Sequence, residues 1–332
     1  MEMWGVHRRS IDGSLAATNP HMTRPSSIPE PTLRDLGEEA LIERVARLAP
    51  VASGTAAGPG DDCAVVDDFS PACDDDRLEL LKTDAIVEDI HYTRDADPAR
   101  VGWKAIARVV SDFAAMGGAP DRFLVMIALP PDRTVKWVDG LYHGMAKAMH
   151  WCDGMLAGGE TTAVPPGSAA VISVAATGRV ARRHLVLRST AMPGDALYVT
   201  DRLGGSLASG RHLDFHPRLA EAAWLVRHFK PTAMMDLSDG LAADLPKLAR
   251  AAGTGFTIDE DAVPRQPGVD ITAAMNDGED FELLFTQRGN LEQFETAWHA
   301  AFPEVALTRI GGMTEPDDTP AAPRGWSHFM TS

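Results

Sequence analysis

The stretch GWKAIARVVSDFAAMGGAP, residues 102–120, decides how the rest of the chain is interpreted. Its apolar residues recur at helical spacing and predict a helix over Val101–Met116. Asp112 shares the helical phase of Val101 and Val109, so its carboxylate is expected on or beside the buried stripe of that helix. A buried carboxylate is costly unless a cation or hydrogen bonds compensate it. Asp112 is therefore predicted to be either a metal ligand or one half of a structural ion pair.

Segments on both sides of this helix alternate between strand and helix patterns. Strands are predicted at Leu78–Thr83, Phe123–Leu129, Val171–Thr177, Ala196–Thr200, Ala233–Asp236, Phe281–Thr286 and Ala306–Ile310. Further helices are predicted at 35–49, Trp137–Trp151, 218–229, after Ser238, and at Leu291–Phe302. This alternation predicts an α/β or α+β fold in two halves that join near Gly178–Arg183. The expected division is a tail over 1–31, an N-terminal domain over 32–180 and a C-terminal α/β domain over 181–332.

The composition is that of a soluble globular chain of 332 residues, long enough for two cores. With 31 basic and 47 acidic residues the net charge is −16, which argues against nucleic acid or an anionic membrane as the main partner. A nucleotide substrate stays compatible with this charge, because bound magnesium can reverse the local sign.

The three cysteines are an odd number without a Cys-x-x-Cys pair, which favours a reduced, cytoplasmic setting. No run of about 18 apolar residues predicts a membrane span. The first 31 residues lack the apolar segment of a signal peptide and show no periodicity, so they are expected to form a disordered tail.

Acidic residues recur as short motifs on five separate predicted elements, which surface decoration does not readily explain. The motifs are Asp61-Asp62, Thr83-Asp84, Ser111-Asp112, Gly159-Glu160-Thr161 and Asp236-Leu237-Ser238-Asp239-Gly240. Carboxylates arranged in this way are typical ligands of several hard cations, with phosphates as the bridging anions. The sequence contains no Gly-x-x-x-x-Gly-Lys-Ser/Thr loop, which excludes a P-loop enzyme.

Each motif has a plainer alternative when it is taken alone. Gly58–Gly60 with its proline is also an ordinary turn, and a Gly158–Gly159 turn is by itself weak evidence for a ligand site. Ser238 or Asp239 could cap the following helix, or the N–H groups of that junction could bind phosphate. Pro246 falls inside the same predicted helix and is expected to break or kink it.

Read in order, the motifs resemble those of the thiamine-monophosphate kinase family, in the superfamily that includes aminoimidazole ribonucleotide synthetase. The matching stretches are GPGDDCAVV (58–66), KTDAIVEDIHY (82–92), GWKAIARVVSDFAAMGGAP (102–120), AGGETT (157–162), LRSTAMPGDALYVT (187–200), AMMDLSDGLAADL (233–245), DGEDFELLFT (277–286) and GWSHF (325–329). The resemblance spans about residues 33–329. It implies a two-domain aminoimidazole ribonucleotide synthetase-like fold and a homodimer in which two N-terminal sheets meet.

The resemblance also implies an activity, namely transfer of the ATP γ-phosphoryl group to thiamine monophosphate with the help of several Mg²⁺ ions. The residues that match magnesium ligands are Asp62, Thr83, Asp84, Asp112, Glu160, Asp236 and Asp239. The residues that match nucleotide contacts are Gly159, Glu160, Arg188 and Ser238, and those around the thiamine substrate are His91, Glu279 and Trp326. Among these, Asp84, Asp112 and Arg188 are expected to act in catalysis.

Three residues depart from the family pattern. Glu160 stands where the family usually has Asp, Lys82 where it has Ser, and Asp89 where it has Gly. These departures leave the number and geometry of the magnesium ions open more than they affect the reaction type. Two alternatives are kept: another ATP-dependent enzyme of the same superfamily, against which the closing GWSHF discriminates, and a non-catalytic nucleotide-binding relative.

Overall fold

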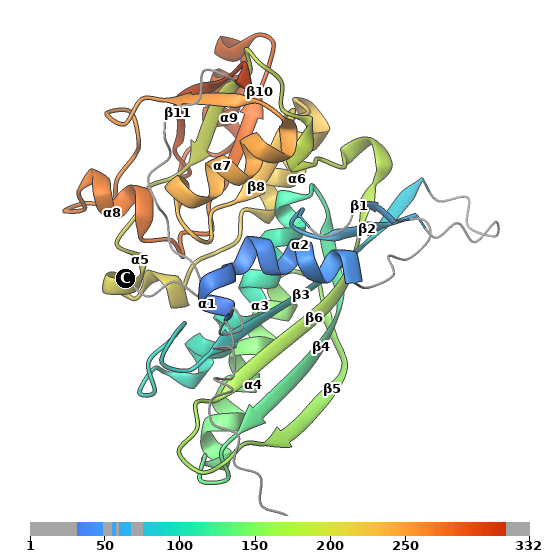
Figure 1. Cartoon of the computed structure of the whole chain (residues 1–332), viewed down its shortest axis with the longest axis vertical. Coiled ribbons are helices and arrows are strands. Elements are labelled where there is room, and N and C mark those ends of the chain that lie inside the picture. Colours follow the sequence, from blue (N-terminus) through green and yellow to red (C-terminus); the bar gives the residue numbers. More distant parts are fainter. Residues whose placement is uncertain (1–31, 49–54, 58–59, 68–75, 317–332) are drawn as a thin grey trace, which may run out of the picture.

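The computed structural model describes residues 32–48, 55–57, 60–67 and 76–316. Within these residues the chain forms a six-stranded and a five-stranded sheet, each with helices packed against it. Figure 1 shows the first sheet in the lower half of the molecule and the second in the upper half. The expected mixture of helices and sheets is therefore present, while the tail predicted over 1–31 lies outside the described residues.

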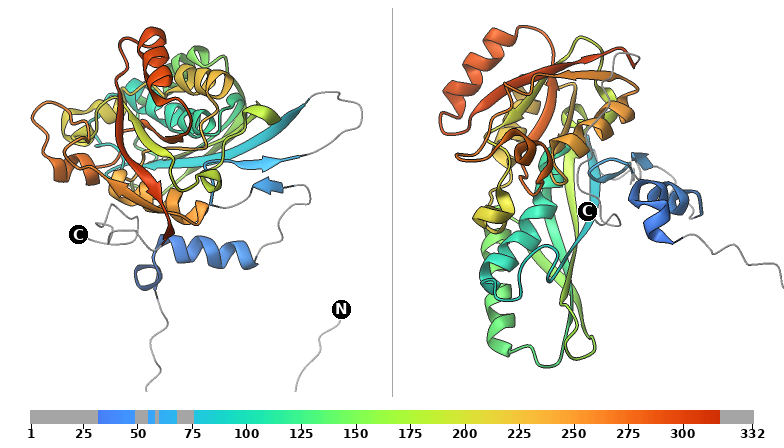
Figure 2. Two further views of the ribbon diagram at one scale, coloured as in Figure 1. Left: turned by 90° about the horizontal axis from the view of Figure 1, so that it is seen from above. Right: turned by 60° about the vertical axis from the view of Figure 1, so that its left-hand side comes forward.

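The six-stranded sheet has the order β1-β2-β3-β6-β4-β5 in the described part of the chain. Its strands are β1 (Thr55–Ala57), β2 (Ala64–Val66), β3 (Arg77–Val87), β4 (Ala119–Leu129), β5 (Met155–Ala163) and β6 (Val171–Ala181). β4 and β5 pair in parallel, and the other neighbouring strands are antiparallel. Helices α3 (Pro98–Ala115) and α4 (Val135–Trp151) lie on one face of this sheet (Figure 2). Two N-terminal helices, α1 (Leu33–Leu36) and α2 (Glu38–Leu48), precede the sheet.

Helix α3 is the central element of the molecule. It begins where the Asp97 side chain accepts hydrogen bonds from two backbone N–H groups and Pro98 takes the first helical position, both of which favour a helix start. Every residue from Val101 to Ala115 is buried, because the helix contacts α4, the first sheet and elements of the second half. Gly102 allows the close approach of α4, since a Cβ there would lie 1.9 Å from the Leu141 carbonyl oxygen.

The five-stranded sheet is antiparallel, with the order β8-β10-β7-β11-β9. Its strands are β7 (Ala196–Thr200), β8 (Ala233–Asp236), β9 (Gly255–Ile258), β10 (Leu283–Gln287) and β11 (Leu307–Thr314). The helices of this half are α5 (Ser206–Ser209), α6 (Leu219–His228), α7 (Leu241–Ala252), α8 (Ile271–Asn276) and α9 (Leu291–Ala301), with 3-10 turns η1 (Arg182–His184), η2 (Arg188–Thr190) and η3 (Arg211–Leu213). Successive β7 residues enter different cores: Leu197 packs in the core that contains α7, and Tyr198 in the core that contains α6 and α9.

The predicted elements are present, β7 and β8 with the predicted ends and the others with shifted ends. β6 continues to Ala181 because residues 178–181 still pair with β3, so the connection between the two sheets begins at Arg182. Of the break or kink predicted at Pro246, the break is absent, since α7 runs through this position. Leu241, Leu245 and Leu248 of α7 are buried in one core, and this packing offsets the hydrogen bond that proline removes.

The predicted Gly158–Gly159 turn is also wrong, because both glycines lie inside strand β5. Gly159 pairs with Val125 of β4, and a Cβ on Gly159 would lie 1.9 Å from the Val125 carbonyl oxygen. Glycine is therefore needed at this position for the approach of a neighbouring strand.

In the described residues, no helix is both long enough and apolar enough to cross a membrane.

Candidate active site

Three aspartates from distant parts of the chain meet between the two sheets. Asp62 lies just before β2, Asp112 lies on α3, and Asp236 ends β8. One carboxylate oxygen of each lies within 4.8 Å of the others. The residues are only 2%, 6% and 4% exposed, respectively. We refer to Asp62, Asp112 and Asp236 as the aspartate cluster.

The cluster carries more negative charge than its surroundings neutralise. Burial raises the pKa of Asp112 well above its usual value; Lys82 opposes this shift and Asp236 adds to it. Burial and the charge of Asp62 likewise raise the pKa of Asp236 to about 7. Carboxylates that resist ionisation because they are buried and lie together would gain from a divalent cation between them.

Two basic side chains pair with members of the cluster. Arg188 donates from Nε and Nη2 to the two carboxylate oxygens of Asp62, at 3.1 and 2.6 Å. Lys82 donates to Oδ1 of Asp112 at 2.7 Å. Of the two alternatives left open for Asp112, the ion pair is present, and metal ligation stays a prediction for a residue that belongs to a group of possible metal ligands.

A second group of charges joins α3 to the segment before β10. Nε of Arg108 lies 3.1 Å from Oδ2 of Asp84, and its Nη1 lies 3.9 Å from Oε1 of Glu279. The buried Lys104 pairs with Glu279 and donates to the His91 carbonyl oxygen at 2.6 Å. Burial opposes the charged form of Asp84, but Arg108 and Lys82 outweigh it and hold the pKa of Asp84 below its usual value.

Residues predicted on the substrate side line one small cavity of about 50 Å³. Its lining includes His91 and Glu279, and also Ser238, predicted as a nucleotide contact, and Asp239, predicted as a magnesium ligand. Nδ1 of His91 accepts a hydrogen bond from the Val87 N–H at 3.0 Å, which fixes the ring next to β3. The structure thus brings these predicted residues together, whereas Trp326 lies outside the described residues.

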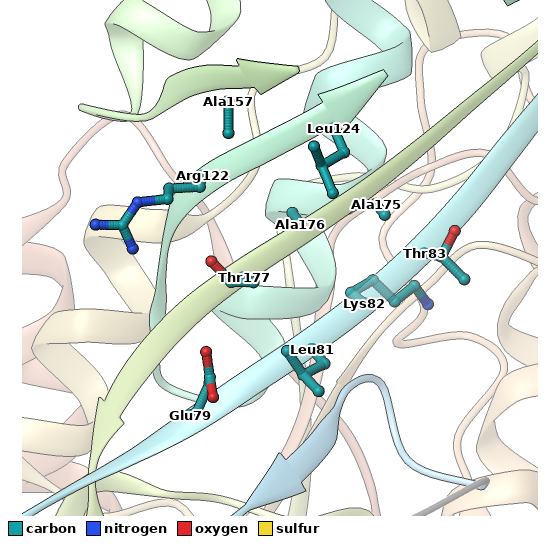
Figure 3. Close-up of a pocket in the computed structure, with 10 residues that line it drawn as sticks. All are labelled: Glu79, Leu81, Lys82, Thr83, Arg122, Leu124, Ala157, Ala175, Ala176 and Thr177. Atoms are coloured by element: carbon teal, nitrogen blue, oxygen red, sulfur yellow. The ribbon is translucent and has the colours of Figure 1, made fainter. Parts of the chain in front are cut away.

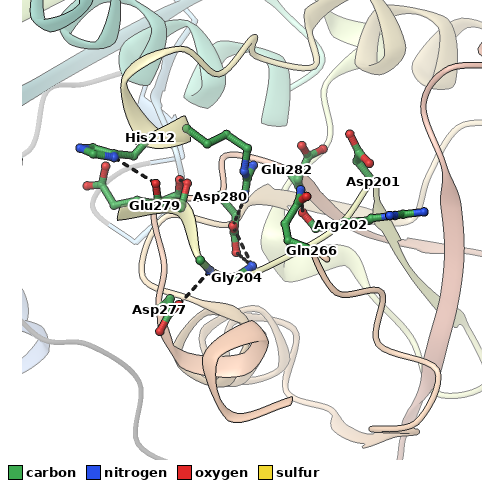
Figure 4. Close-up of polar contacts among 12 residues, drawn as sticks. Asp201, Arg202, Gly204, His212, Gln266, Asp277, Glu279, Asp280 and Glu282 are labelled. Carbon is green, nitrogen blue, oxygen red and sulfur yellow. Dashed lines mark hydrogen bonds and ion pairs between the residues drawn. The ribbon is translucent and has the colours of Figure 1, made fainter. Parts of the chain in front are cut away.

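The acidic run before β10 has mostly structural roles (Figure 4). Asp277 accepts from the Gly205 N–H at 2.8 Å, and Asp280 accepts from the Gly204 N–H at 3.0 and 3.1 Å. Glu282 accepts from the Thr200 hydroxyl at 2.6 Å. Glu279 differs from these three acidic residues because it pairs with Lys104 of α3. The backbone φ of Glu279 is 57°, in the left-handed region.

The junction between β8 and α7 differs from its predicted form. The N-cap is Gly240, and neither Ser238 nor Asp239 caps the helix. Instead, the backbone N–H groups of Ser238 and Asp239 donate to Oδ2 of Asp244, at 3.0 and 2.9 Å. Lys247 pairs with both Asp239 and Asp244. Asp244 and Lys247 were not predicted from the sequence as part of the site, although an acid in the first helical turn is a recognisable signal.

Two predicted magnesium ligands lie away from the cluster. Side chains alternate along β3, so Thr83 lies on the sheet face opposite α3. It is exposed there and lines a cavity of 460 Å³ (Figure 3). Glu160 lies on the edge strand β5, which β6 and β4 separate from β3. Three strand spacings amount to about 14 Å, too far for Glu160 to reach Asp84 across the sheet. The carboxylate of Glu160 accepts from the N–H of Thr161 at 2.9 Å.

The departure at Asp89 has a local explanation. Asp89 has a φ of 64°, in the left-handed region that glycine adopts readily and that Asp tolerates better than most residues. Its N–H donates to the Tyr92 carbonyl oxygen at 2.8 Å, so the turn is kept.

Comparisons with known proteins agree with this arrangement. Two family models match, "AIR synthase related protein, N-terminal domain" over residues 60–180 and "AIR synthase related protein, C-terminal domain" over residues 200–306. The thiamine-monophosphate kinase of Aquifex aeolicus (strain VF5) is 31% identical over 331 residues, 90% of this chain and 99% of that protein. The thiamine-monophosphate kinase of Escherichia coli (strain K12) is 31% identical over 314 residues, 82% of this chain and 92% of that protein.

Solved structures give the same result. The structure of AaThiL complexed with AMPPCP and TMP has a TM-score of 0.72 and 30% sequence identity, over 90% of this chain and 98% of that one. The hydrogenase maturation protein HypE of E. coli, at a TM-score of 0.62 and 21% identity over 84% of this chain and 91% of its own, shares the fold. The two-domain fold expected from the sequence is confirmed by these matches. The chain belongs to the thiamine-monophosphate kinase family of AIR synthase related proteins.

Proposed function

We infer that this chain is a thiamine-monophosphate kinase, which transfers the γ-phosphoryl group of ATP to thiamine monophosphate and forms thiamine diphosphate and ADP. The observation that carries this inference is the buried aspartate cluster between the two sheets. It occurs in a chain that aligns with relatives of that name over nearly their whole length. A relative at 30% identity was solved in complex with AMPPCP and TMP.

The chemistry fits the residues present. The acceptor is a phosphate oxygen that is already ionised near neutral pH, so the site needs no dedicated general base. The main difficulty is the repulsion between two phosphate-bearing anions, which positioned cations relieve. Arg188 offers a planar guanidinium that would bind a phosphate through two hydrogen bonds in place of the Asp62 carboxylate that it holds here.

We propose Mg²⁺ as the cofactor, held by the aspartate cluster with Asp84 and Asp239 beside it. Three buried carboxylates with oxygens within 4.8 Å of one another fit the preference of this hard cation for oxygen ligands. When bound, the ion supplies positive charge that offsets the charge of the phosphates. The roles of Thr83, Glu160, Gly159 and Ser238 stay predictions.

We propose that the thiamine moiety binds near His91 and Glu279, which line the same small cavity. The positive thiazolium ring of thiamine suits a carboxylate, and Lys104 together with Arg108 holds Glu279 in place. Trp326 would add an aromatic face for that ring.

We further propose that the protein acts as a homodimer. The sheet face opposite α3 exposes apolar side chains, among them Leu81 and Leu124, around the 460 Å³ cavity. A second copy of this sheet would cover that face. Such a copy could also supply Gly159 and Glu160 to a site that they do not reach within one chain.

The test is a product assay with purified protein, ATP, Mg²⁺ and thiamine monophosphate, in which nucleotides and thiamine phosphates are separated by anion-exchange chromatography. We expect thiamine diphosphate and ADP in equal amounts, and no product when EDTA replaces Mg²⁺. Untouched thiamine monophosphate, together with cyclisation of an aminoimidazole precursor, would instead support the other superfamily activity. Nucleotide binding without turnover of either substrate would support the non-catalytic alternative.

A further inference from the structure

We propose that the ammonium group of Lys82 is a built-in cation of the aspartate cluster and takes the place of one divalent ion that the carboxylates would otherwise bind. This inference rests on the proposed function, because it concerns how that active site is neutralised. It predicts that the protein binds fewer magnesium ions, or binds them more weakly, than the same site without the lysine.

The position of Lys82 supports this role. Lys82 lies on β3, and its side chain, 22% exposed, reaches Oδ1 of Asp112 at 2.7 Å. That same aspartate contributes an oxygen to the group in which Asp62 and Asp236 lie within 4.8 Å. The lysine nitrogen therefore contacts the set of oxygens that a metal ion would share.

The charges around Lys82 point the same way. The 2.7 Å contact between Nζ of Lys82 and Oδ1 of Asp112 is an ion pair, so the lysine already supplies a positive charge to this oxygen of the cluster. A divalent ion bound to Asp112 would sit against this positive charge, and like charges repel strongly where water is scarce.

A simple charge count shows what the lysine changes. The three carboxylates of the cluster carry three negative charges when ionised, and Arg188 and Lys82 pair with two of them. One negative charge is left, that of Asp236, which accepts a hydrogen bond from the Ser111 side chain. An uncharged residue at position 82 would leave two negative charges, which favours an additional divalent ion.

A purely structural role is the main alternative. A buried ion pair can serve only to satisfy its two partners, and then an uncharged residue changes stability without changing metal binding. The two roles differ in the stoichiometry and affinity of metal binding, which can be measured without substrates.

The experiment titrates Mn²⁺ into full-length, substrate-free protein and follows free Mn²⁺ by electron paramagnetic resonance. Lys82→Met removes the charge at similar length, and Lys82→Gln also keeps a hydrogen-bond donor for Asp112. The matched control is Lys136→Met, at an exposed position on α4. We expect both Lys82 variants to bind one more Mn²⁺ per chain, or to bind Mn²⁺ at least tenfold more tightly, while the control behaves as wild type.

Thermal melting gives a second readout. In EDTA, Lys82→Met and Lys82→Gln should melt at lower temperature than wild type. Mn²⁺ should then raise the melting temperature of these variants by more than it raises that of wild type. Variants that fold only with Mn²⁺ would support the proposal as well. Wild-type Mn²⁺ binding by both variants, or failure of both to fold with and without Mn²⁺, would overturn it and leave Lys82 a structural role.

Failure of the proposed kinase activity and failure of the inference about Lys82 give different results in these measurements. The Mn²⁺ titration uses neither ATP nor thiamine monophosphate, so it gives a result even if the product assay shows a different reaction. A kinase with normal product formation and unchanged Mn²⁺ binding in the Lys82 variants would contradict only the inference about Lys82.

Discussion

At the scale of single residues, Arg188 connects the two halves of the site. It lies on η2, in the connection between the two sheets, and holds Asp62 through two hydrogen bonds. We expect Arg188→Met to lower kcat/KM for ATP by about 10²–10³-fold, the usual effect of losing one positioned electrostatic group. Arg188→Lys keeps the charge but loses the planar fork, so its loss should be smaller. Steady-state kinetics at saturating thiamine monophosphate measures both, and a kcat/KM near wild type for Arg188→Met would contradict the phosphate role.

Glu160 lies away from the aspartate cluster, on an exposed strand. If its carboxylate acts on magnesium from a second copy of the chain, its charge should matter more than its length. We expect Glu160→Asp to retain activity within about tenfold, or about 1.4 kcal/mol. Glu160→Gln should lose more and need a higher Mg²⁺ concentration for half-maximal rate. Identical rates and Mg²⁺ dependence in wild type and Glu160→Gln would remove Glu160 from the site.

At the scale of elements, the contact between α3 and α4 positions Asp112. The two helices approach closely at Gly102, where a Cβ would lie 1.9 Å from the Leu141 carbonyl oxygen. At Gly140 of α4 a Cβ would instead lie 2.7 Å from the Pro98 ring, which is a side chain. Both substitutions to alanine gain the same helix propensity, so they form a matched pair.

We expect Gly102→Ala to lower the free energy of unfolding by about 1–3 kcal/mol, as overpacking in a core does. Gly140→Ala should cost less, because its contact of 2.7 Å is with Cγ of a proline ring, which can shift by a change of ring pucker, and not with a backbone carbonyl at 1.9 Å. Urea unfolding followed by circular dichroism measures the difference. A Gly102→Ala variant more stable than Gly140→Ala would contradict this expectation. It would mean that α3 and α4 can move apart and that their close packing does not hold α3 in place.

At the scale of the whole molecule, the open face of the first sheet is the feature that a second copy would cover. Leu124 is 49% exposed on this face, and Val135 at the start of α4 is 76% exposed on the other side of the sheet. We expect Leu124→Asp to convert the protein to a monomer, because a carboxylate buried in the interface would be unpaired. Val135→Asp is the control and should leave the dimer intact. Size-exclusion chromatography with light scattering measures both masses, and a monomeric wild type would refute the dimer.

Local sequence determined most of the elements. The helical spacing of apolar residues predicted α3 and α4 within three residues at each end, and short apolar runs predicted β7 and β8 with the ends that they have. These signals are local, since the period of apolar residues reflects the backbone geometry of one element. β5 was missed because its GGETT segment has two glycines and no apolar alternation, and only the approach to Val125 of β4 explains them.

The tertiary structure alone decided how the charged residues pair. The motifs predicted which acidic residues belong to a site, but not that Lys82 contacts Asp112, that Arg188 contacts Asp62, or that Lys104 contacts Glu279. These partners are 30, 126 and 175 residues apart in the chain, respectively. No periodic pattern relates residues at such distances. The approach of Lys82 to Asp112 and of Lys104 to Glu279 depends on the packing of α3, and that of Arg188 to Asp62 on the path of the connection between the two sheets. The sequence by itself thus determined most of the elements and predicted the chemical type of the site, and the tertiary packing determined which cation pairs with which carboxylate.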